Sequence, residues 1–263
     1  KYNVKVLGTE YNIRAKKVSR DYGHLSAELD QFERDFYWPF ANALDAIDYT
    51  VAGLTEFERV CELLQEYYDA VEAFSSTYSI KSQSKFRSTV LEEFNSHLFA
   101  RHPVVDSLGL EFLNKRIYAG LKLSAGARPT IIPKDVDFCI GKSYTMAIGG
   151  QNQELSIPVI CVEVKTYLDA TMYGEVSFSA RQLRNATPEV KLYVLMEYNE
   201  VAKARIIASR SDTALDEMFA LRSSAADPLD AVTLKAYYDE MDQALNGIGA
   251  ASSLTLPGRM LKP

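Results

Sequence analysis

The sequence predicts a mixed α/β fold in which a mixed central sheet is flanked by helices and preceded by an N-terminal helical lobe. Two apolar, β-branched runs at 136–140 and 157–165 are typical of buried strands. Between residues 24 and 74, apolar side chains recur at helical spacing instead. Helical patterns at 83–99 and 176–185 stand on either side of the strand-like runs. This alternation of helices and strands indicates a sheet covered by helices.

Length and composition fit one large domain, or a domain with an appended lobe. The chain has 263 residues, of which 47% are hydrophobic, as in ordinary globular proteins. No apolar run reaches the ~18 residues of a membrane helix, and no signal peptide is recognisable. The three cysteines show no C-x-x-C spacing, and Cys139 and Cys161 fall on apolar runs, as buried thiols do. We therefore expect a reducing, cytoplasmic location and no membrane partner.

Charge is unevenly distributed along the chain. The formal net charge is −6, yet residues 21–80 alone hold 13 acidic and 2 basic residues. The remainder holds 27 basic and 22 acidic residues. A chain divided in this way can bind a polyanion on one side only.

The first 82 residues are predicted to form an arm and an acidic helical lobe. Residues 1–20 alternate apolar and polar side chains as a short hairpin or arm does, and their basic residues include Lys16 and Lys17. These lysines fit a solvated face or, less commonly, a contact with the DNA backbone. Helices are predicted at 24–48 and 54–74, the second capped by Thr55 with Glu58 in a capping box. Their aromatic side chains fit a core or a subunit interface, and their acidic charge predicts a lobe that would face away from any DNA.

Residues 83–210 are predicted to form the core, and 211–263 the C-terminal helices and tail. A helix at 83–99 buries Phe86, Val90, Phe94 and Leu98. Its Glu93 lies nearer that face than Glu92 and could reach toward the sheet, although an exposed helical carboxylate is the common alternative. The expected strands are 116–123, 136–140 with a continuation at 144–148, 157–165, 190–198 and 204–208, and the expected later helices are 176–185, 212–221 and 228–245.

Charged residues end the most apolar of these strands. Glu163 and Lys165 share one face of the strand because side chains alternate. An aspartate that begins the neighbouring strand can lie opposite them, and both Asp135 and Asp137 are candidates. Carboxylates and water hold Mg²⁺ without a full protein cage, and a lysine beside the ion can orient the attacking water. The alternative is a solvated strand end with a cross-strand salt bridge.

This Asp…Glu-x-Lys arrangement resembles the PD-(D/E)XK nuclease superfamily. The predicted order helix–strand–strand–strand–helix–strand over 83–198 is the core order of that fold. The string Cys161-Val162-Glu163-Val164-Lys165-Thr166-Tyr167-Leu168-Asp169-Ala170-Thr171-Met172 is similar to the BbvCI-type heterodimeric restriction endonucleases, over roughly residues 81–198. Those enzymes pair two related subunits on a short asymmetric site.

The resemblance implies roles for individual residues. Asp137 and Glu163 correspond to Mg²⁺ ligands and Lys165 to the lysine beside the attacking water. Glu93, with Glu92 as the less favoured alternative, corresponds to an extra carboxylate before the first core strand. The family has one aspartate where this sequence offers two, and we choose Asp137 because the strand continues directly from it. A second Glu-x-Lys, formed by Glu189 and Lys191, begins a strand instead of ending one and is interpreted as solvated charge.

The resemblance also implies the reaction and the partners. It indicates a Mg²⁺-dependent type II restriction endonuclease subunit that cuts one strand of double-stranded DNA beside a homologous but non-identical subunit. A homodimer in isolation is the alternative assembly. The alternatives are a recognition or scaffold subunit without chemistry, and a repair or junction nuclease of the same fold. After the catalytic strand, the helix carries side chains suited to reading bases or contacting phosphates. These are Arg181, Gln182, Arg184 and Asn185.

Overall fold

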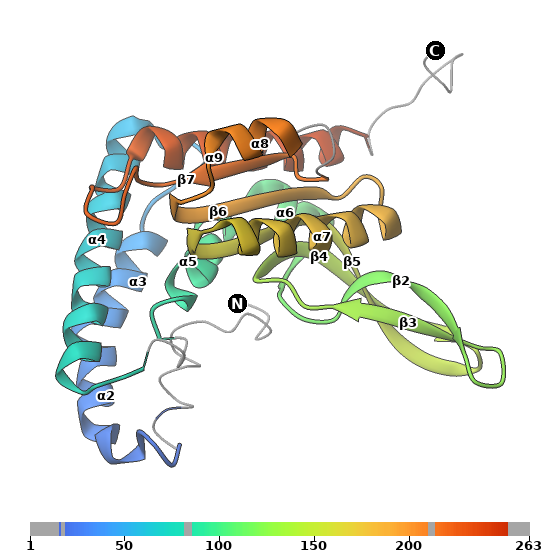
Figure 1. Ribbon diagram of the computed structural model, residues 1–263, viewed down its shortest axis with the longest axis horizontal. Helices are drawn as coiled ribbons and strands as arrows, with labels where there is room; N and C mark the ends of the chain where they lie inside the picture. The colour runs from blue at the N-terminus through green and yellow to red at the C-terminus, as the bar shows by residue number, and fades with distance from the viewer. Residues whose placement is uncertain (1–15, 17–18, 82–85, 210–213, 252–263) are drawn as a thin grey trace.

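The computed structural model describes residue 16 and residues 19–81, 86–209 and 214–251. Most of the arm predicted for residues 1–20, Lys17 included, lies outside the described residues. A central sheet is crossed by one helix in the foreground, and a helical lobe stands at the opposite end of the molecule from a projecting pair of strands (Figure 1). Of the described helices, none combines the length and the apolar character of a membrane span.

The N-terminal lobe contains the two predicted helices, but the first is interrupted. A π-helical segment, η2, separates two short helices in place of a continuous helix over 24–48, and Pro39 follows at the start of the second, where its missing N–H is tolerated. The lobe consists of η1 (Gly23–Leu25), α2 (Ser26–Phe32), η2 (Glu33–Tyr37), α3 (Trp38–Asp45) and α4 (Leu54–Thr77). The predicted cap of α4 is wrong by two residues, because the Gly53 N–H donates to Glu56 Oε2 at 2.8 Å and the helix is already formed at Thr55.

The core is a seven-stranded mixed sheet with helices on both faces. Its elements are α5 (Thr89–Phe99), α6 (Pro103–Leu108), β1 (Glu111–Leu113), β2 (Ile117–Ser124), β3 (Arg128–Lys134), β4 (Phe138–Ile148), β5 (Gln151–Leu168), α7 (Ala170–Ala186), β6 (Lys191–Asn199), α8 (Lys203–Ser209), β7 (Glu217–Ala220) and α9 (Ala231–Ala251). The order is β1-β4-β5-β2-β3, and β6 also pairs with β5 and carries β7. Strand β5 pairs with β2 at Ser156 and with β6 from Ile160 onward, so β2 and β3 branch away from the sheet. The expected mixed α/β architecture is confirmed.

Two predicted elements near the C-terminus are wrong. The segment predicted as a strand at 204–208 is helix α8, and the helix predicted over 212–221 contains strand β7 instead. Strand β7 pairs with β6 in parallel, and parallel neighbours require a crossover connection, which is usually a helix. Tertiary pairing therefore decides both elements, because short segments with mixed apolar and polar residues have weak local preferences.

Other differences have local causes. Strand β3 is not predicted from the sequence because Pro129 and Pro133 argue against a strand. The structure accommodates these prolines because β3 is the edge strand of its branch of the sheet. Helix α7 begins six residues before its predicted start because the Asp169 carboxylate accepts the N–H groups of Thr171 and Met172, at 2.8 Å each. The short elements β1 and α6 are also additions to the prediction.

The two faces of β5 pack against different helices. Val162 and Val164 belong to the large core cluster that contains the apolar face of α5, the lobe helices and α9. Cys161 faces the other way, in a cluster with Ala180 and Leu183 of α7. One hydrophobic core therefore joins residues from the N-terminal lobe, the sheet and the C-terminal helix.

A buried ion cluster crosses the same boundaries. The Glu197 carboxylate at the end of β6 is 1% exposed and accepts hydrogen bonds from Arg222, after β7, and from Arg87, before α5. The Arg87 guanidinium also lies 5.1 Å from the ring centre of Tyr68 on α4. A single carboxylate thus links four segments that are distant in the sequence.

Glycine is required where β4 changes register. The pairing of β4 with β5 shifts between Ile140 and Gly141, and a Cβ atom at Gly141 would lie 2.5 Å from the carbonyl oxygen of Ile157. We expect Gly141→Ala to lower the free energy of unfolding by about 1–3 kcal/mol, because backbone must move to admit the methyl group. Urea denaturation measures the change. Gly174→Ala is the control, because nothing lies within 4 Å of its Cβ position in α7, and it should be neutral or stabilising.

Candidate active site

The antiparallel register of β4 and β5 places the predicted acidic residues side by side. Phe138 pairs with Val162, so Asp137, which directly precedes β4, lies beside Glu163. The Val164 N–H donates to Asp137 Oδ2 at 2.8 Å, and this bond fixes the aspartate side chain on the neighbouring strand. This backbone donor is not predictable from the sequence, because only the register of the two strands places it beside Asp137.

Lys165 lies between the two carboxylates. Its Nζ donates to Asp137 Oδ2 at 2.8 Å and to Glu163 Oε2 at 3.2 Å, and the Val164 carbonyl accepts a third bond at 3.1 Å. The three charged side chains remain 18–27% exposed, so solvent still reaches the group. The predicted convergence of Asp137, Glu163 and Lys165 is present.

The electrostatics of this group favour a cation at its centre. Burial, followed by the charge of Asp137, raises the pKa of Glu163, while Lys165 opposes the shift. Burial lowers the pKa of Lys165, but the two carboxylates together raise it by more than burial lowers it, so the pKa of Lys165 is raised. Two neighbouring carboxylates repel each other, and a positive charge between them relieves the repulsion. Their oxygens are also the ligand type that Mg²⁺ prefers, so Asp137 and Glu163 fit such an ion with water filling its remaining positions.

Glu93 is placed differently from the other predicted ligands. It lies on α5, whose apolar face packs on the Val162 and Val164 side of β5, whereas Glu163 points to the opposite face of that strand. Glu93 Oε1 accepts a hydrogen bond from Tyr37 Oη at 2.6 Å. Within the described ranges, no three His, Cys, Asp or Glu side chains form a group that could hold a metal ion. The proposed third ligand is therefore not assembled with the first two in this structure.

Asp135 and Asp137 have separate environments. Asp135 turns toward the start of β2, where Oδ1 accepts the Arg116 N–H at 3.1 Å and Oδ2 lies 3.5 Å from Lys115 Nζ. Its side chain is 64% exposed. Of the two aspartates that the sequence leaves as candidates, Asp137 is the one in contact with Lys165.

The second Glu-x-Lys lies at the start of β6, as expected. Glu189 is exposed, and Lys191 donates to Asp216 Oδ1 at 3.2 Å. The Asp216 carboxylate also accepts a bond from Arg184 at 2.5 Å and the Leu192 N–H at 2.8 Å. Lys191 therefore belongs to a structural cluster at the far side of β6.

The five predicted DNA-binding residues that the structure describes divide into three groups. Arg181, Gln182 and Asn185 are exposed on one face of α7 and are open to a ligand. Arg184 instead contacts Asp216 and the Ala214 carbonyl, which tie α7 to the start of β7. Lys16 is 5% exposed, with its ammonium 5.3 Å from the ring centre of Phe86, a position that does not present it to a phosphate.

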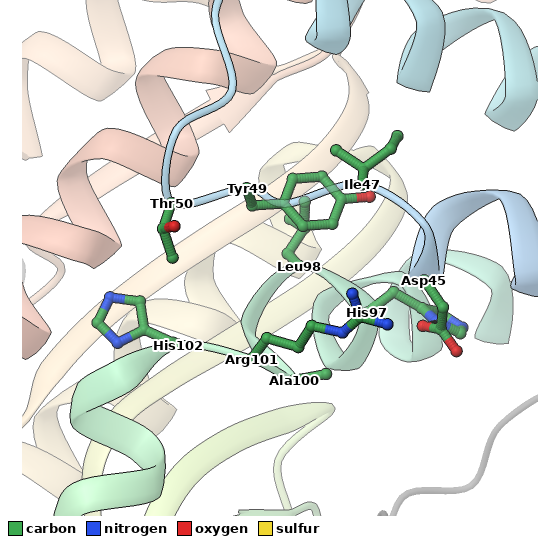
Figure 2. Close-up of a pocket in the computed structure, with 9 residues that line it drawn as sticks. All are labelled: Asp45, Ile47, Tyr49, Thr50, His97, Leu98, Ala100, Arg101 and His102. Atoms are coloured by element: carbon green, nitrogen blue, oxygen red, sulfur yellow. Dashed lines mark hydrogen bonds and ion pairs between the residues drawn. The ribbon is translucent and has the colours of Figure 1, made fainter.

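A hollow at the junction of the lobe and α5 is too small for a ligand. Figure 2 shows its lining, with Tyr49 above Leu98 and the Arg101 side chain extending across the foreground. Its volume is about 10 Å³, roughly the space of one water molecule. His97 Nδ1 lies 2.6 Å from Asp45 Oδ1 at one end, and His102 Nε2 contacts Asp242 Oδ1 at 2.8 Å. These two histidine–aspartate pairs connect separate helices. The candidate site therefore remains the cluster of Asp137, Glu163 and Lys165, which we call the Asp137 group.

Comparison with known proteins identifies a family and several solved structures, two of which are described here. The family model described as Bpu10I restriction endonuclease matches residues 83–243. The solved structure described as "native BbvCI A2B2 tetramer at low resolution" is 15% identical, with 90% of this chain and 95% of that chain covered and a TM-score of 0.72. The structure described as "Restriction endonuclease PspGI-substrate DNA complex" is also 15% identical, covers 91% and 93% of the two chains, and has a TM-score of 0.37. No match is found among curated proteins.

Proposed function

The chain belongs to the Bpu10I restriction endonuclease family and is a type II site-specific deoxyribonuclease, and from that premise we propose that it hydrolyses one strand of a short asymmetric DNA site with Mg²⁺. The observation that carries this proposal is the contact of Lys165 with both Asp137 and Glu163. A solvent-accessible group of two carboxylates and one ammonium is suited to phosphodiester hydrolysis.

Each residue of the group has a task in the proposed reaction. Asp137 and Glu163 would hold Mg²⁺, which supplies Lewis-acid polarisation of a phosphate oxygen and a more acidic water. Lys165 offsets the negative charge that develops on the phosphate. When a carboxylate binds the ion instead of the ammonium, the N–H of Lys165 that is released would orient the attacking water. The Val164 N–H keeps the Asp137 carboxylate in position throughout. On α7, exposed Arg181, Gln182 and Asn185 are proposed to contact bases or phosphates.

Glu93 is proposed as a conditional third ligand. Its hydrogen bond to Tyr37 and its place on α5 hold it apart from the Asp137 group in this structure. A ligand role therefore requires that the Glu93 carboxylate move toward the Asp137 and Glu163 side chains.

The number of sites in the chain sets the proposed stoichiometry. In the part of the chain that the structure describes, Lys165 contacts both an aspartate and the glutamate of its own motif, whereas no ion pair joins Lys191 to Glu189. One such site performs one in-line displacement at a time, so cutting a duplex in one binding event calls for a second subunit. The BbvCI structure is an A2B2 tetramer, and we propose a homologous but different partner for this chain as well.

The test is strand-specific nicking. This chain carrying Glu163→Gly, combined with an intact homologous partner subunit, should nick one defined strand, because the partner site alone remains active. End labels on each strand of the duplex identify the cut. Efficient double-strand cleavage by that pair would contradict the assignment. Cleavage of a palindrome by this chain alone would show instead that it acts as a two-fold symmetric homodimer.

A further inference from the structure

The β2–β3 ribbon has a charge unlike that of the rest of the protein. Residues 115–134 contain five basic residues and no acidic residue, in a chain whose net charge is −6. The β2–β5 pairing is limited to Ile117 and Ser156, and the ribbon projects at the end of the molecule opposite α4 (Figure 1). The β4–β5 turn accompanies it, with the Cβ position of Gly149 3.1 Å from Pro129. A cationic ribbon that protrudes from an acidic protein requires an explanation.

The strand register gathers its polar side chains on one face. Ser124 pairs with Arg128 and Lys122 with Thr130, so these four share a face, and Lys134 lies on the same face of β3. The opposite face is apolar, with Leu121 opposite Ile131 and Leu123 opposite Pro129. The ribbon is therefore amphipathic, with three of its five basic residues, Lys122, Arg128 and Lys134, on one side together with Ile132.

These cations keep their charge available. Lys122 and Arg128 are exposed, and neither forms an ion pair within the described residues, whereas Lys115 at the base is 3.5 Å from Asp135. Near the turn, Thr130 Oγ1 donates to Ser124 Oγ at 3.1 Å, and Ser124 Oγ donates to the Arg128 carbonyl at 3.0 Å. These bonds stabilise the turn while leaving the cationic groups open to a ligand.

The cationic face starts on the same side of the sheet as the candidate active site. Ile117, which pairs with Lys134, packs in the cluster of Cys161 and α7. Glu163 lies two residues beyond Cys161 on β5 and so shares that side. Asp137 follows the end of β3 by three residues. A polyanion that lies along the cationic face would therefore run toward Asp137 and Glu163.

We propose that the β2–β3 ribbon binds the phosphate backbone of the DNA duplex through Lys122 and Arg128, beside the site of cleavage. The inference rests on the proposed function, since it assigns the surface that holds that function's substrate. A two-stranded ribbon has dimensions that fit along or within the major groove, and exposed lysine and arginine neutralise phosphates. The acidic lobe at the other end repels the duplex and favours the same orientation.

The experiment compares two double variants that change net charge equally. Lys122→Gln/Arg128→Gln removes two charges from the ribbon, and Arg34→Gln/Arg59→Gln removes two exposed charges from the lobe. Binding of the full chain to a fluorescent mixed-sequence duplex is measured by anisotropy over a range of salt concentrations, with Ca²⁺ in place of Mg²⁺. For the ribbon variant we expect affinity to fall by roughly tenfold per contact near 0.1 M salt, and the slope of log K against log salt to become less negative by about 2. The lobe variant should match the wild-type slope.

Two results would overturn the proposal, and they are distinguishable. If the wild type binds DNA and both double variants share its affinity and slope, the ribbon does not contact phosphates, while the proposed function stands. If the ribbon contacts a protein subunit instead, DNA binding would be unchanged in this way, and the ribbon variant would differ from the wild type in its sedimentation coefficient. If the wild type, combined with its homologous partner subunit, neither binds nor cuts DNA, the proposed function fails and the ribbon assignment fails with it.

Discussion

Replacing Glu163 with glycine, or Lys165 with glutamate, is expected to abolish strand cleavage, with a loss on the order of 10³-fold or more in the single-turnover rate. Glu163→Gly removes one of the two carboxylates that contact the Lys165 ammonium, and this carboxylate is also a proposed metal ligand. The second places a third carboxylate where Lys165 now contacts Asp137 and Glu163. DNA affinity should be largely retained, because other lysines and arginines hold the phosphates.

The chain contains its own matched control for this prediction. Glu189→Gly changes an exposed glutamate in the second Glu-x-Lys motif and should cut at the wild-type rate. Cleavage is followed on a strand-labelled duplex in Mg²⁺, with circular dichroism to confirm that each variant is folded. Wild-type cleavage by either site variant would refute the assignment of the Asp137 group. Equal loss in the Glu189 variant would point to a general effect on folding or assembly.

Replacing Glu197 with methionine is expected to lower the free energy of unfolding by about 3–5 kcal/mol. The methionine side chain is similar in length to that of Glu197, but it has no carboxylate. Arg87 and the buried Arg222 would therefore lose the carboxylate that they share. An uncompensated buried charge is costly because the protein interior solvates it poorly. Chemical denaturation measures the loss.

A second substitution separates this cause from a packing defect. Adding Arg222→Met to Glu197→Met removes the unpaired cation together with its partner, and a substantial part of the lost stability should return. Asp239→Ala, which breaks the exposed pair with Lys235 on α9, is the control and should cost less than about 1 kcal/mol. An unchanged stability in Glu197→Met would mean that the cluster does not join the lobe to the core.

The sequence alone predicted the central part of the fold and the charged residues that meet at the end of β5. The apolar runs that became β4 and β5 were recognisable because burial on both faces of a strand selects β-branched side chains in an unbroken run. Glu163 and Lys165 were recognisable for the opposite reason, since charge at the end of such a run has no structural requirement. Helices α4 and α5 followed from strong apolar periodicity over several turns.

Only the tertiary structure decided the elements that depend on pairing. The sequence favoured Asp137 over Asp135 because a strand follows it directly, but the contact of its carboxylate with Lys165 depends on the β4–β5 register and on the Val164 N–H, neither of which is encoded locally. Strand β7 and helix α8 exist because β7 pairs in parallel with β6 and needs a crossover. The cationic face of the ribbon likewise requires the β2–β3 register, although its lack of acidic residues was visible in the sequence. Local sequence sets what each segment can form, and long-range pairing decides which residues meet, because that pairing depends on contacts between residues far apart in the chain.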